Sequence, residues 1–110
     1  MHTFQLGIKS TLEVISPSTE KLRTMLHTIR SNKLRREVFR KCARMVENRE
    51  REPPRLDVVT RWNSTVEMFR QAIKATDILN FTISDLTISS DFNGYVLTRE
   101  DWNHIHAMEE

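Results

Sequence analysis

Apolar residues recur at the three- and four-residue spacing of an α-helix through most of the first 48 residues of this chain. Ser16 and Pro17 form a helix start, because serine can cap the free amides of a first turn and proline is tolerated at the first helical position. This patterning is typical of amphipathic helices that bury one face. It predicts a mainly α fold that opens with helices over about 3–15, 17–31 and 33–48.

The second half of the chain is predicted to be more interrupted. The double proline at 53–54 pushes the residues before it out of helical geometry, and residues 56–59 suit a short extended piece. Ser64 with Glu67 fits a capping box, and the run 98–101 is a second capping signature. The predicted organisation is one partial domain with helices over 1–48, a proline-containing linker with an Arg-Trp motif over 49–63, a helix over 64–79, a loop or hairpin over 80–97 and a truncated helix over 98–110.

The size of the chain limits it to one small domain. Its 110 residues, 38% of them apolar, exclude a two-domain enzyme and make a self-sufficient core doubtful. We therefore expect the isolated chain to fold poorly or to self-associate. Residues 1–74 carry a net charge of +8 and residues 75–110 one of −6. This asymmetry indicates either an anionic partner for the basic part, most commonly nucleic acid, or neutralisation of one part by the other on folding.

The helix predicted over 33–48 has strongly basic sides. Arg36, Arg40 and Arg44 lie outside its apolar stripe, and few acidic residues oppose them. These arginines are either solvated surface or contacts for DNA phosphates. Cys42 lies on the apolar stripe, which predicts a small core residue rather than a nucleophile.

The sequence excludes several kinds of site. One cysteine rules out a disulfide framework and a multi-cysteine zinc site. His104 and His106, two residues apart on a predicted helix, point to different sides and do not suggest a metal centre. Two glycines are too few for a glycine-rich phosphate loop. Without a membrane-length apolar run or a secretory signal, we expect an intracellular, soluble chain.

Arg61 and Trp62 stand side by side where a helix is expected to begin. Arginine offers a fixed fork of donors for phosphate or a base edge, and tryptophan offers a flat face on which a base can stack. The pair is therefore suited to binding DNA. The alternative is that Trp62 is a core anchor at the point where the linker meets the helix, and the residues alone leave both interpretations open.

The run Leu56–Thr65, which reads LDVVTRWNST, resembles the signature of the hAT superfamily of DNA transposases and of the BED-zinc-finger and ricesleeper-like proteins derived from them. Residues 2–9 resemble the stretch that begins at the histidine of that family's Cys-x-x-His motif. Matching pieces within 22–42 and 95–102 extend the resemblance over almost the whole chain. It identifies the chain as an internal fragment of an hAT-type transposase or a transposon-derived protein.

This resemblance implies a helical fragment of a ribonuclease-H-like transposase domain that runs into its helical insertion. The family's catalytic acidic triad binds two divalent metals, Mg or Mn, and it falls outside the matched stretch. Hence Asp57 and Glu67 receive no catalytic role, and the chain is expected to need no cofactor and to be catalytically incompetent alone. Arg61 and Trp62 resemble the residues that hold distorted DNA and stack on a flipped base, and His2 resembles the motif histidine near the active site.

The remaining expectations concern partners and location. The resemblance implies a nuclear protein that binds DNA. The basic stretch over 33–55 predicts that this binding is weak and without sequence preference in isolation. The amphipathic helices, which need partner faces, predict self-association, and we expect no membrane contact. The BED zinc finger and the dimerisation region of the family are not expected within these residues. The alternative function is a domesticated helical module that binds another protein.

Overall fold

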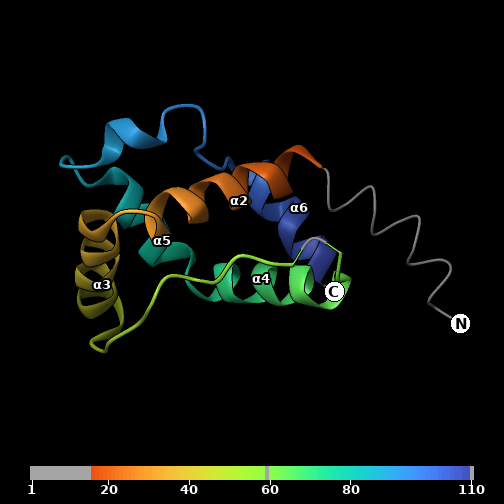
Figure 1. Ribbon diagram of the computed structural model, residues 1–110, viewed down its shortest axis with the longest axis horizontal. Coiled ribbons are helices and arrows are strands. Elements are labelled where there is room, and N and C mark those ends of the chain that lie inside the picture. The colour runs from red at the N-terminus through yellow and green to blue at the C-terminus, as the bar shows by residue number, and fades with distance from the viewer. Residues whose placement is uncertain (1–15, 59, 110) are drawn as a thin grey trace, which may run out of the picture.

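In the computed structural model, residues 16–58 and 60–109 are described, and within them the chain is helical with no β-strand. The elements are α2 (Pro17–Arg30), α3 (Lys33–Glu47), α4 (Trp62–Lys74), α5 (Thr76–Ser84), the 3₁₀ helix η1 (Ser89–Phe92) and α6 (Arg99–Glu109) (Figure 1). This confirms the predicted mainly α class. The helix predicted over 3–15 and the motif residue His2 lie outside the described residues.

Local capping residues begin three of the helices. The Ser16 hydroxyl accepts the Thr19 N–H at 3.3 Å at the start of α2, and the Asn32 side chain accepts the Arg35 N–H at 3.1 Å at the start of α3. Such side chains satisfy amides that have no partner within the helix. The helices predicted over 17–31 and 33–48 are therefore confirmed, each to within a residue.

The capping signature at the start of α6 is confirmed in full. The Thr98 hydroxyl accepts the Asp101 N–H at 3.1 Å, and the Asp101 carboxylate accepts the Thr98 N–H at 2.9 Å. This reciprocal pair is a capping box with aspartate in place of glutamate. The same carboxylate accepts hydrogen bonds from Ser18 and Lys21, so it also fixes α6 against α2.

The helix predicted over 64–79 is wrong in its bounds and its continuity. α4 begins at Trp62 with Arg61 as its N-cap, which makes no side-chain capping bond. A break at Ala75 separates α4 from α5, and the Thr76 hydroxyl bonds the carbonyl of Ile73 at 2.7 Å beside it. Hydroxyls that bond a preceding turn often accompany bends in a helix.

The loop or hairpin predicted over 80–97 is also partly wrong, because α5 continues to Ser84. The Thr82 hydroxyl bonds the carbonyl of Ile78, and the Ser84 hydroxyl bonds that of Asn80. These bonds within the helix satisfy polar groups that otherwise favour turns. The rest of the segment is η1 with coil on either side, and its Phe92 is buried.

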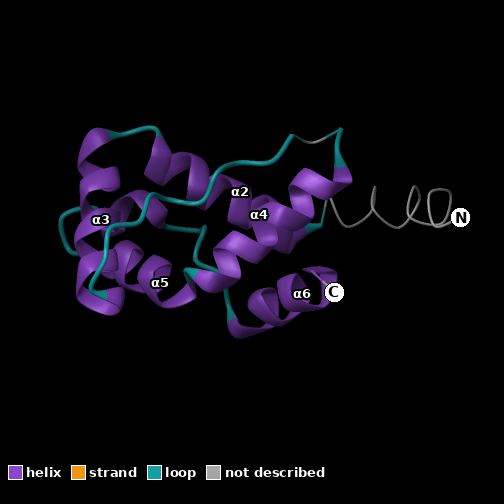
Figure 2. Cartoon of the chain, turned by 90° about the horizontal axis from the view of Figure 1, so that it is seen from below, coloured by secondary structure: helices purple, strands orange, loops and turns teal. Residues whose placement is uncertain are grey.

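The helices form two packed pairs joined by α2. α3 packs against α5, α4 packs against α6, and α2 contacts both α3 and α6 (Figures 1 and 2). Cys42 lies in the core and is 3% exposed, as its place on the apolar stripe predicted. The largest fully buried apolar side chains are Leu22, Met25, Leu26, Ile29, Phe39, Phe69, Ile78, Leu79, Ile88, Phe92 and Ile105.

Opposite charges of the two halves of the chain meet in the fold. Lys21 pairs with Asp101 at 3.0 Å, and Arg35 pairs with Asp91 at 3.0 Å. Lys41 pairs with Asp85 at 3.1 Å. Intramolecular neutralisation, one of the two interpretations of the charge asymmetry, therefore takes place at these pairs.

Candidate nucleic-acid interface

The Arg61–Trp62 turn lies at one end of the molecule. An extended segment leads from the end of α3 along the molecule to the start of α4 (Figure 1). The Arg61 N–H donates to the Val58 carbonyl at 2.8 Å, and the Ser64 N–H donates to the Arg61 carbonyl at 3.0 Å. These bonds close a tight turn that continues into the first turn of α4.

The Arg61 side chain is exposed and makes no hydrogen bond or ion pair with any residue that the structure describes. Its guanidinium therefore presents its fork of donors to solvent. An arginine in this position can reach an oxygen of a phosphate or a base without first breaking a bond inside the protein.

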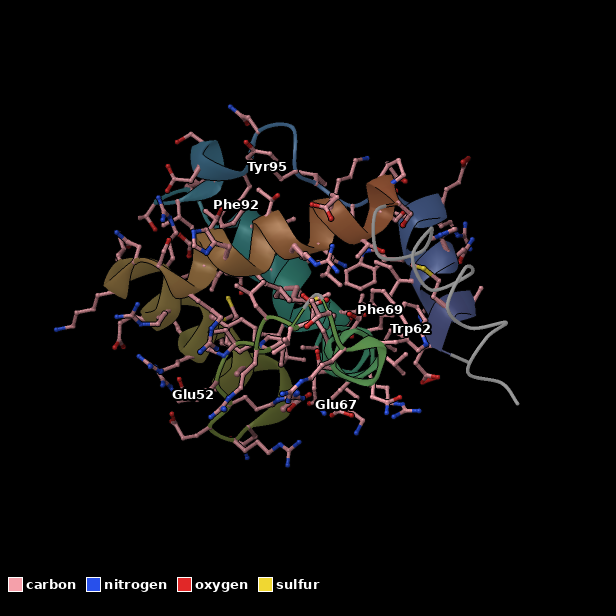
Figure 3. The ribbon with its side chains drawn as sticks, turned by 45° about the vertical axis from the view of Figure 1, so that its right-hand side comes forward. Glu52, Trp62, Glu67, Phe69, Phe92 and Tyr95 are labelled. Carbon is pink, nitrogen blue, oxygen red and sulfur yellow. The ribbon has the colours of Figure 1, made fainter. Side chains whose placement is uncertain are left out.

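Trp62 takes one of the two roles that the sequence left open, because it packs on the core. Its ring is half-buried and packs on the core, with the Phe69 ring in an edge-to-face arrangement at 6.2 Å between centroids and 76° between planes (Figure 3). Aromatic pairs favour this geometry. The contact holds the indole in place, while the rest of the ring remains accessible. The role of Trp62 in DNA binding stays a prediction.

Three other polar residues of the motif, Asp57, Ser64 and Thr65, form hydrogen bonds within the fold. Asp57 accepts two hydrogen bonds from the Arg23 guanidinium, at 2.9 and 2.7 Å, and one from the Thr65 hydroxyl at 2.5 Å. The Ser64 hydroxyl bonds both the N–H and the carbonyl of Val58. These contacts explain why Ser64 is not a helix cap. They give Asp57 a structural place in the turn.

Asp57 is held in its charged form. Its side chain is only 1% exposed, and burial alone would raise its pKa. The hydrogen bonds from Arg23 and Thr65 outweigh that effect and lower the pKa of Asp57 below its usual value. The sequence patterns did not predict this network, because Arg23 lies on α2, Asp57 in the extended segment and Thr65 on α4. The closely spaced polar residues of the motif were the one sequence signal that could have indicated such a hydrogen-bond network.

The predicted DNA-binding arginines of α3 lie at the other end of the molecule (Figures 1 and 2). Arg36 donates to the carbonyl of Arg30 at 2.6 Å, so part of its donor fork is used within the fold. Arg40 pairs with Glu37 and Glu52, and Arg44 pairs with Glu50. The fold does not bring these residues together with the Arg61–Trp62 turn, and their role in binding stays a prediction.

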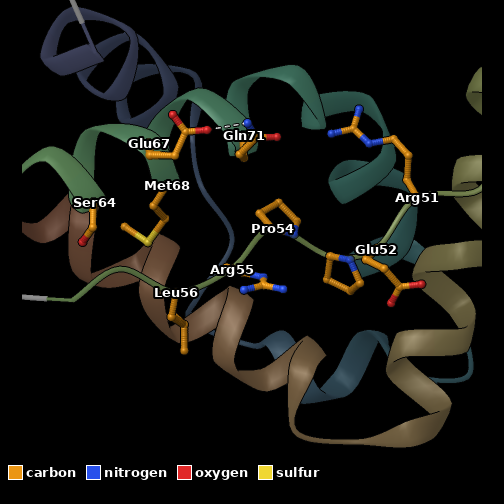
Figure 4. A pocket seen from close by; sticks show the side chains of 10 residues that line it. Arg51, Glu52, Pro54, Arg55, Leu56, Ser64, Glu67, Met68 and Gln71 are labelled. Atoms are coloured by element: carbon orange, nitrogen blue, oxygen red, sulfur yellow. Dashed lines mark hydrogen bonds between the residues drawn. The ribbon is translucent and has the colours of Figure 1, made fainter.

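A cleft of about 470 Å³ lies between the extended segment and α4 (Figure 4). Pro54, Leu56 and Met68 supply its apolar walls, and Arg55 and Glu67 also line it. Glu67 accepts a hydrogen bond from Gln71 at 2.6 Å. The cleft therefore lies between the extended segment and the middle of α4, and it reaches Ser64 beside the Arg61–Trp62 turn.

Two kinds of site are absent from the residues that the structure describes. Over residues 16–58 and 60–109, no cluster of three or more His, Cys, Asp or Glu side chains could hold a metal ion. None of the helices described there has the length and apolar character that crossing a membrane requires.

Comparison with known proteins places these observations in a family. The model of the ZBED1 RNase-like helical domain matches residues 1–110. The putative AC transposase and the putative AC9 transposase of Zea mays are each 35% identical to the chain over 72 residues, which is 66% of this chain and 9% of either relative. Among solved structures, none matches the chain.

Proposed function

The chain belongs to the ZBED1 RNase-like helical domain family and is related to hAT-type transposases, and from this premise we propose that it contacts DNA through Arg61 and Trp62. In this proposal the guanidinium binds the DNA backbone beside an unpaired base, and the indole stacks on that base. The chain acts in the nucleus as part of a transposase-derived protein. It does not cut DNA by itself.

One observation carries the proposal, namely the division of the motif into an inward and an outward part. Asp57, Ser64 and Thr65 bond within the fold, whereas the Arg61 side chain points to solvent without a partner in the described chain. A motif that only stabilised the turn would not need an arginine whose guanidinium is left to solvent beside a partly exposed indole. Stacking of one base on an aromatic side chain contributes about 1–3 kcal/mol.

The arginines of α3 supply a weaker, sequence-independent contribution in this proposal. Their ion pairs with neighbouring glutamates are exposed and cost little to exchange for phosphates. Binding through such a surface has a dissociation constant of about 10⁻⁴–10⁻⁶ M at physiological salt and weakens as salt rises. It holds DNA on the protein without selecting for an unpaired base.

The absence of cutting activity is proposed from the donor set. Two-metal cleavage of DNA needs carboxylates that hold two ions about 3.5–4 Å apart. Asp57, the carboxylate in the motif, is occupied by Arg23 and Thr65. Incubation of the chain with DNA and Mg²⁺ or Mn²⁺ should yield no cut strands, and cleavage that disappears in a point variant would overturn this part of the proposal.

The experiment compares two DNAs of the same sequence, a plain duplex and one with an unpaired base. Binding is followed by fluorescence anisotropy at several salt concentrations. Trp62→Ala should weaken binding to the DNA with the unpaired base more than to the duplex, because stacking needs an accessible base face. Arg40→Ala combined with Arg44→Ala should weaken both alike and flatten the salt dependence.

The result that contradicts the proposal is equally specific. If Trp62→Ala weakens binding to both DNAs equally, or lowers only thermal stability, then Trp62 is a core anchor on Phe69 and not a base-stacking residue. Arg61→Lys serves as a matched control for the charge of Arg61, because lysine keeps the positive charge but lacks the fork of donors of the guanidinium.

A second candidate function, protein interaction, is favoured by apolar side chains at the α3–α5 end. Met45 on α3, Phe81 on α5 and Leu86 after α5 are exposed, and Leu86 is 93% exposed. The partner in this proposal is a second copy of the chain. Phe81→Ser combined with Leu86→Ser should shift the sedimentation coefficient from an associated species to the monomer, and an unchanged coefficient would reject this candidate.

A further inference from the structure

A buried polar network fixes both sides of the Arg61–Trp62 turn. Asp57 lies four residues before Arg61, and Thr65 lies three residues after Trp62. The Thr65 hydroxyl donates to the Asp57 carboxylate at 2.5 Å, which closes the turn at its base. The described residues between them, 58 and 60–64, are therefore constrained from both ends.

The same carboxylate docks the turn on a distant helix. Arg23 of α2 forms two parallel hydrogen bonds with Asp57, at 2.9 and 2.7 Å, and the two side chains are 13% and 1% exposed. Bidentate arginine–carboxylate pairs fix orientation as well as distance. Glu20, one turn earlier on α2, also accepts a hydrogen bond from Arg23 and holds the guanidinium from its outer side.

We propose that Asp57 is the positioning residue of the Arg61–Trp62 turn, which it locks between α2 and α4 so that the turn selects DNA with an unpaired base. This inference rests on the function proposed above. Asp57 does not touch DNA itself. It acts through the turn by fixing where the Arg61 guanidinium and the exposed part of the Trp62 ring stand relative to each other.

A second set of bonds shows that the turn is held as a unit. The Ser64 hydroxyl accepts the Val58 N–H at 2.7 Å and donates to the Val58 carbonyl at 3.1 Å. Together with the Arg61 N–H bond to the same carbonyl, it leaves the backbone of the turn little freedom. Release of Asp57 removes the anchor of this unit to α2 while the helix that follows stays intact.

The experiment separates positioning from stability with a matched control. Asp57→Asn removes the carboxylate charge of the turn. Asp101→Asn removes a comparable buried carboxylate, which bonds Ser18 and Lys21 of the same α2 but lies at the start of α6. Thr65→Val replaces the buried hydroxyl by a methyl group, whereas Thr65→Ser keeps the hydroxyl. The full chain is used in each case.

Two measurements are made on every variant. The first is the ratio of the dissociation constants for duplex DNA and for DNA with an unpaired base. The second is amide hydrogen exchange over residues 60–65 in the free chain. Asp57→Asn and Thr65→Val should lower the ratio about tenfold and speed exchange in the turn, since the stacking contribution is lost when Trp62 is misplaced.

For the two control variants we expect no change in the ratio of the dissociation constants. Asp101→Asn should lower thermal stability but leave both the ratio and the exchange of the turn unchanged, and Thr65→Ser should keep the wild-type ratio. The proposal is overturned if Asp57→Asn and Asp101→Asn change the ratio alike, or if exchange of the turn is unchanged in Asp57→Asn.

Failure of the underlying function gives a different result. If the wild-type chain does not distinguish the two DNAs, the proposed DNA contact is wrong, and so is the selective role of Asp57. Hydrogen exchange then decides the remaining part of the inference. Faster exchange in Asp57→Asn and not in Asp101→Asn keeps Asp57 as the residue that orders the turn, and equal exchange rejects it.

Discussion

The substitution Asp101→Asn tests how the fold is held at the junction of α2 and α6. The Asp101 carboxylate accepts hydrogen bonds from the Ser18 hydroxyl at 2.7 Å, the Lys21 ammonium at 3.0 Å and the Thr98 N–H at 2.9 Å. Its side chain is 12% exposed. Asparagine has nearly the same shape but lacks the charge and one acceptor oxygen.

The expected loss of stability follows from these contacts. A hydrogen bond to a charged group contributes about 1.5–3 kcal/mol, and loss of a helix cap costs about 1 kcal/mol. The half-exposed pair with Lys21 adds less than about 1 kcal/mol. Because the amide oxygen of asparagine still accepts from some donors, we expect a net loss of about 2 kcal/mol, or about 8–16 °C in Tm for a domain of this size.

The pH dependence gives this prediction its sign. Burial alone would raise the pKa of Asp101, but hydrogen bonds from Thr98, Ser18 and Lys21 outweigh it and hold that pKa well below its usual value. The carboxylate of the unfolded chain titrates near about 3.9. The stabilisation is therefore fully present above about pH 5 and is lost as pH falls through about 4 toward the folded-state pKa.

The assay is urea unfolding of the wild type and Asp101→Asn, followed by far-ultraviolet circular dichroism from neutral to acidic pH. The difference in free energy of unfolding should shrink as pH falls through this window. Glu100→Gln is the control, because it removes an exposed charge from the same first turn of α6 and should cost less than about 0.5 kcal/mol. A difference that stays constant with pH, or a control as destabilised as Asp101→Asn, would refute the reasoning.

Two further predictions concern buried side chains. The indole N–H of Trp102 is buried and has no hydrogen-bond partner in the described part of the chain, so Trp102→Phe should change the free energy of unfolding by less than about 1 kcal/mol, since removal of an unsatisfied donor offsets part of the lost packing. A loss clearly above about 1 kcal/mol in chemical unfolding would contradict this. Cys42 is 3% exposed, so its reaction with a thiol reagent should be slow in buffer and fast in denaturant; equal rates would place it at the surface.

The sequence was sufficient where the signals were local. Ser16 caps α2, and the reciprocal bonds of Thr98 and Asp101 begin α6, as their types and spacing predicted. These interactions join residues three apart in the chain, so a short window contains both partners. The position of Cys42 on an apolar stripe predicted its burial for the same reason.

Distant contacts decided the features that the sequence did not predict. Ser64 has the type and spacing of a helix cap, but it bonds the backbone of Val58, and α4 begins two residues earlier. Thr82 belongs to a run rich in turn-forming residues, yet its hydroxyl bonds within α5 and its side chain is buried there. Asp57 and Arg23 are 34 residues apart, and no local pattern pairs them.

The same distinction applies to the candidate interface. Sequence reasoning found Arg61 and Trp62 from their chemistry and from a family resemblance. It could not show that Trp62 packs edge-to-face on Phe69, nor that Arg40 shares its guanidinium between two glutamates. Such pairing depends on which side chains the tertiary fold brings within reach.

The central claim, that Trp62 stacks on an unpaired base, is tested most directly by the fluorescence of Trp62 itself. In the Trp102→Phe chain, Trp62 is the single remaining tryptophan. Titration with DNA that carries an unpaired base should quench this emission to saturation, and the quenching should persist at salt concentrations that weaken phosphate binding. Plain duplex should bind with little quenching. Binding of both DNAs with equal quenching, or with none, would contradict the account.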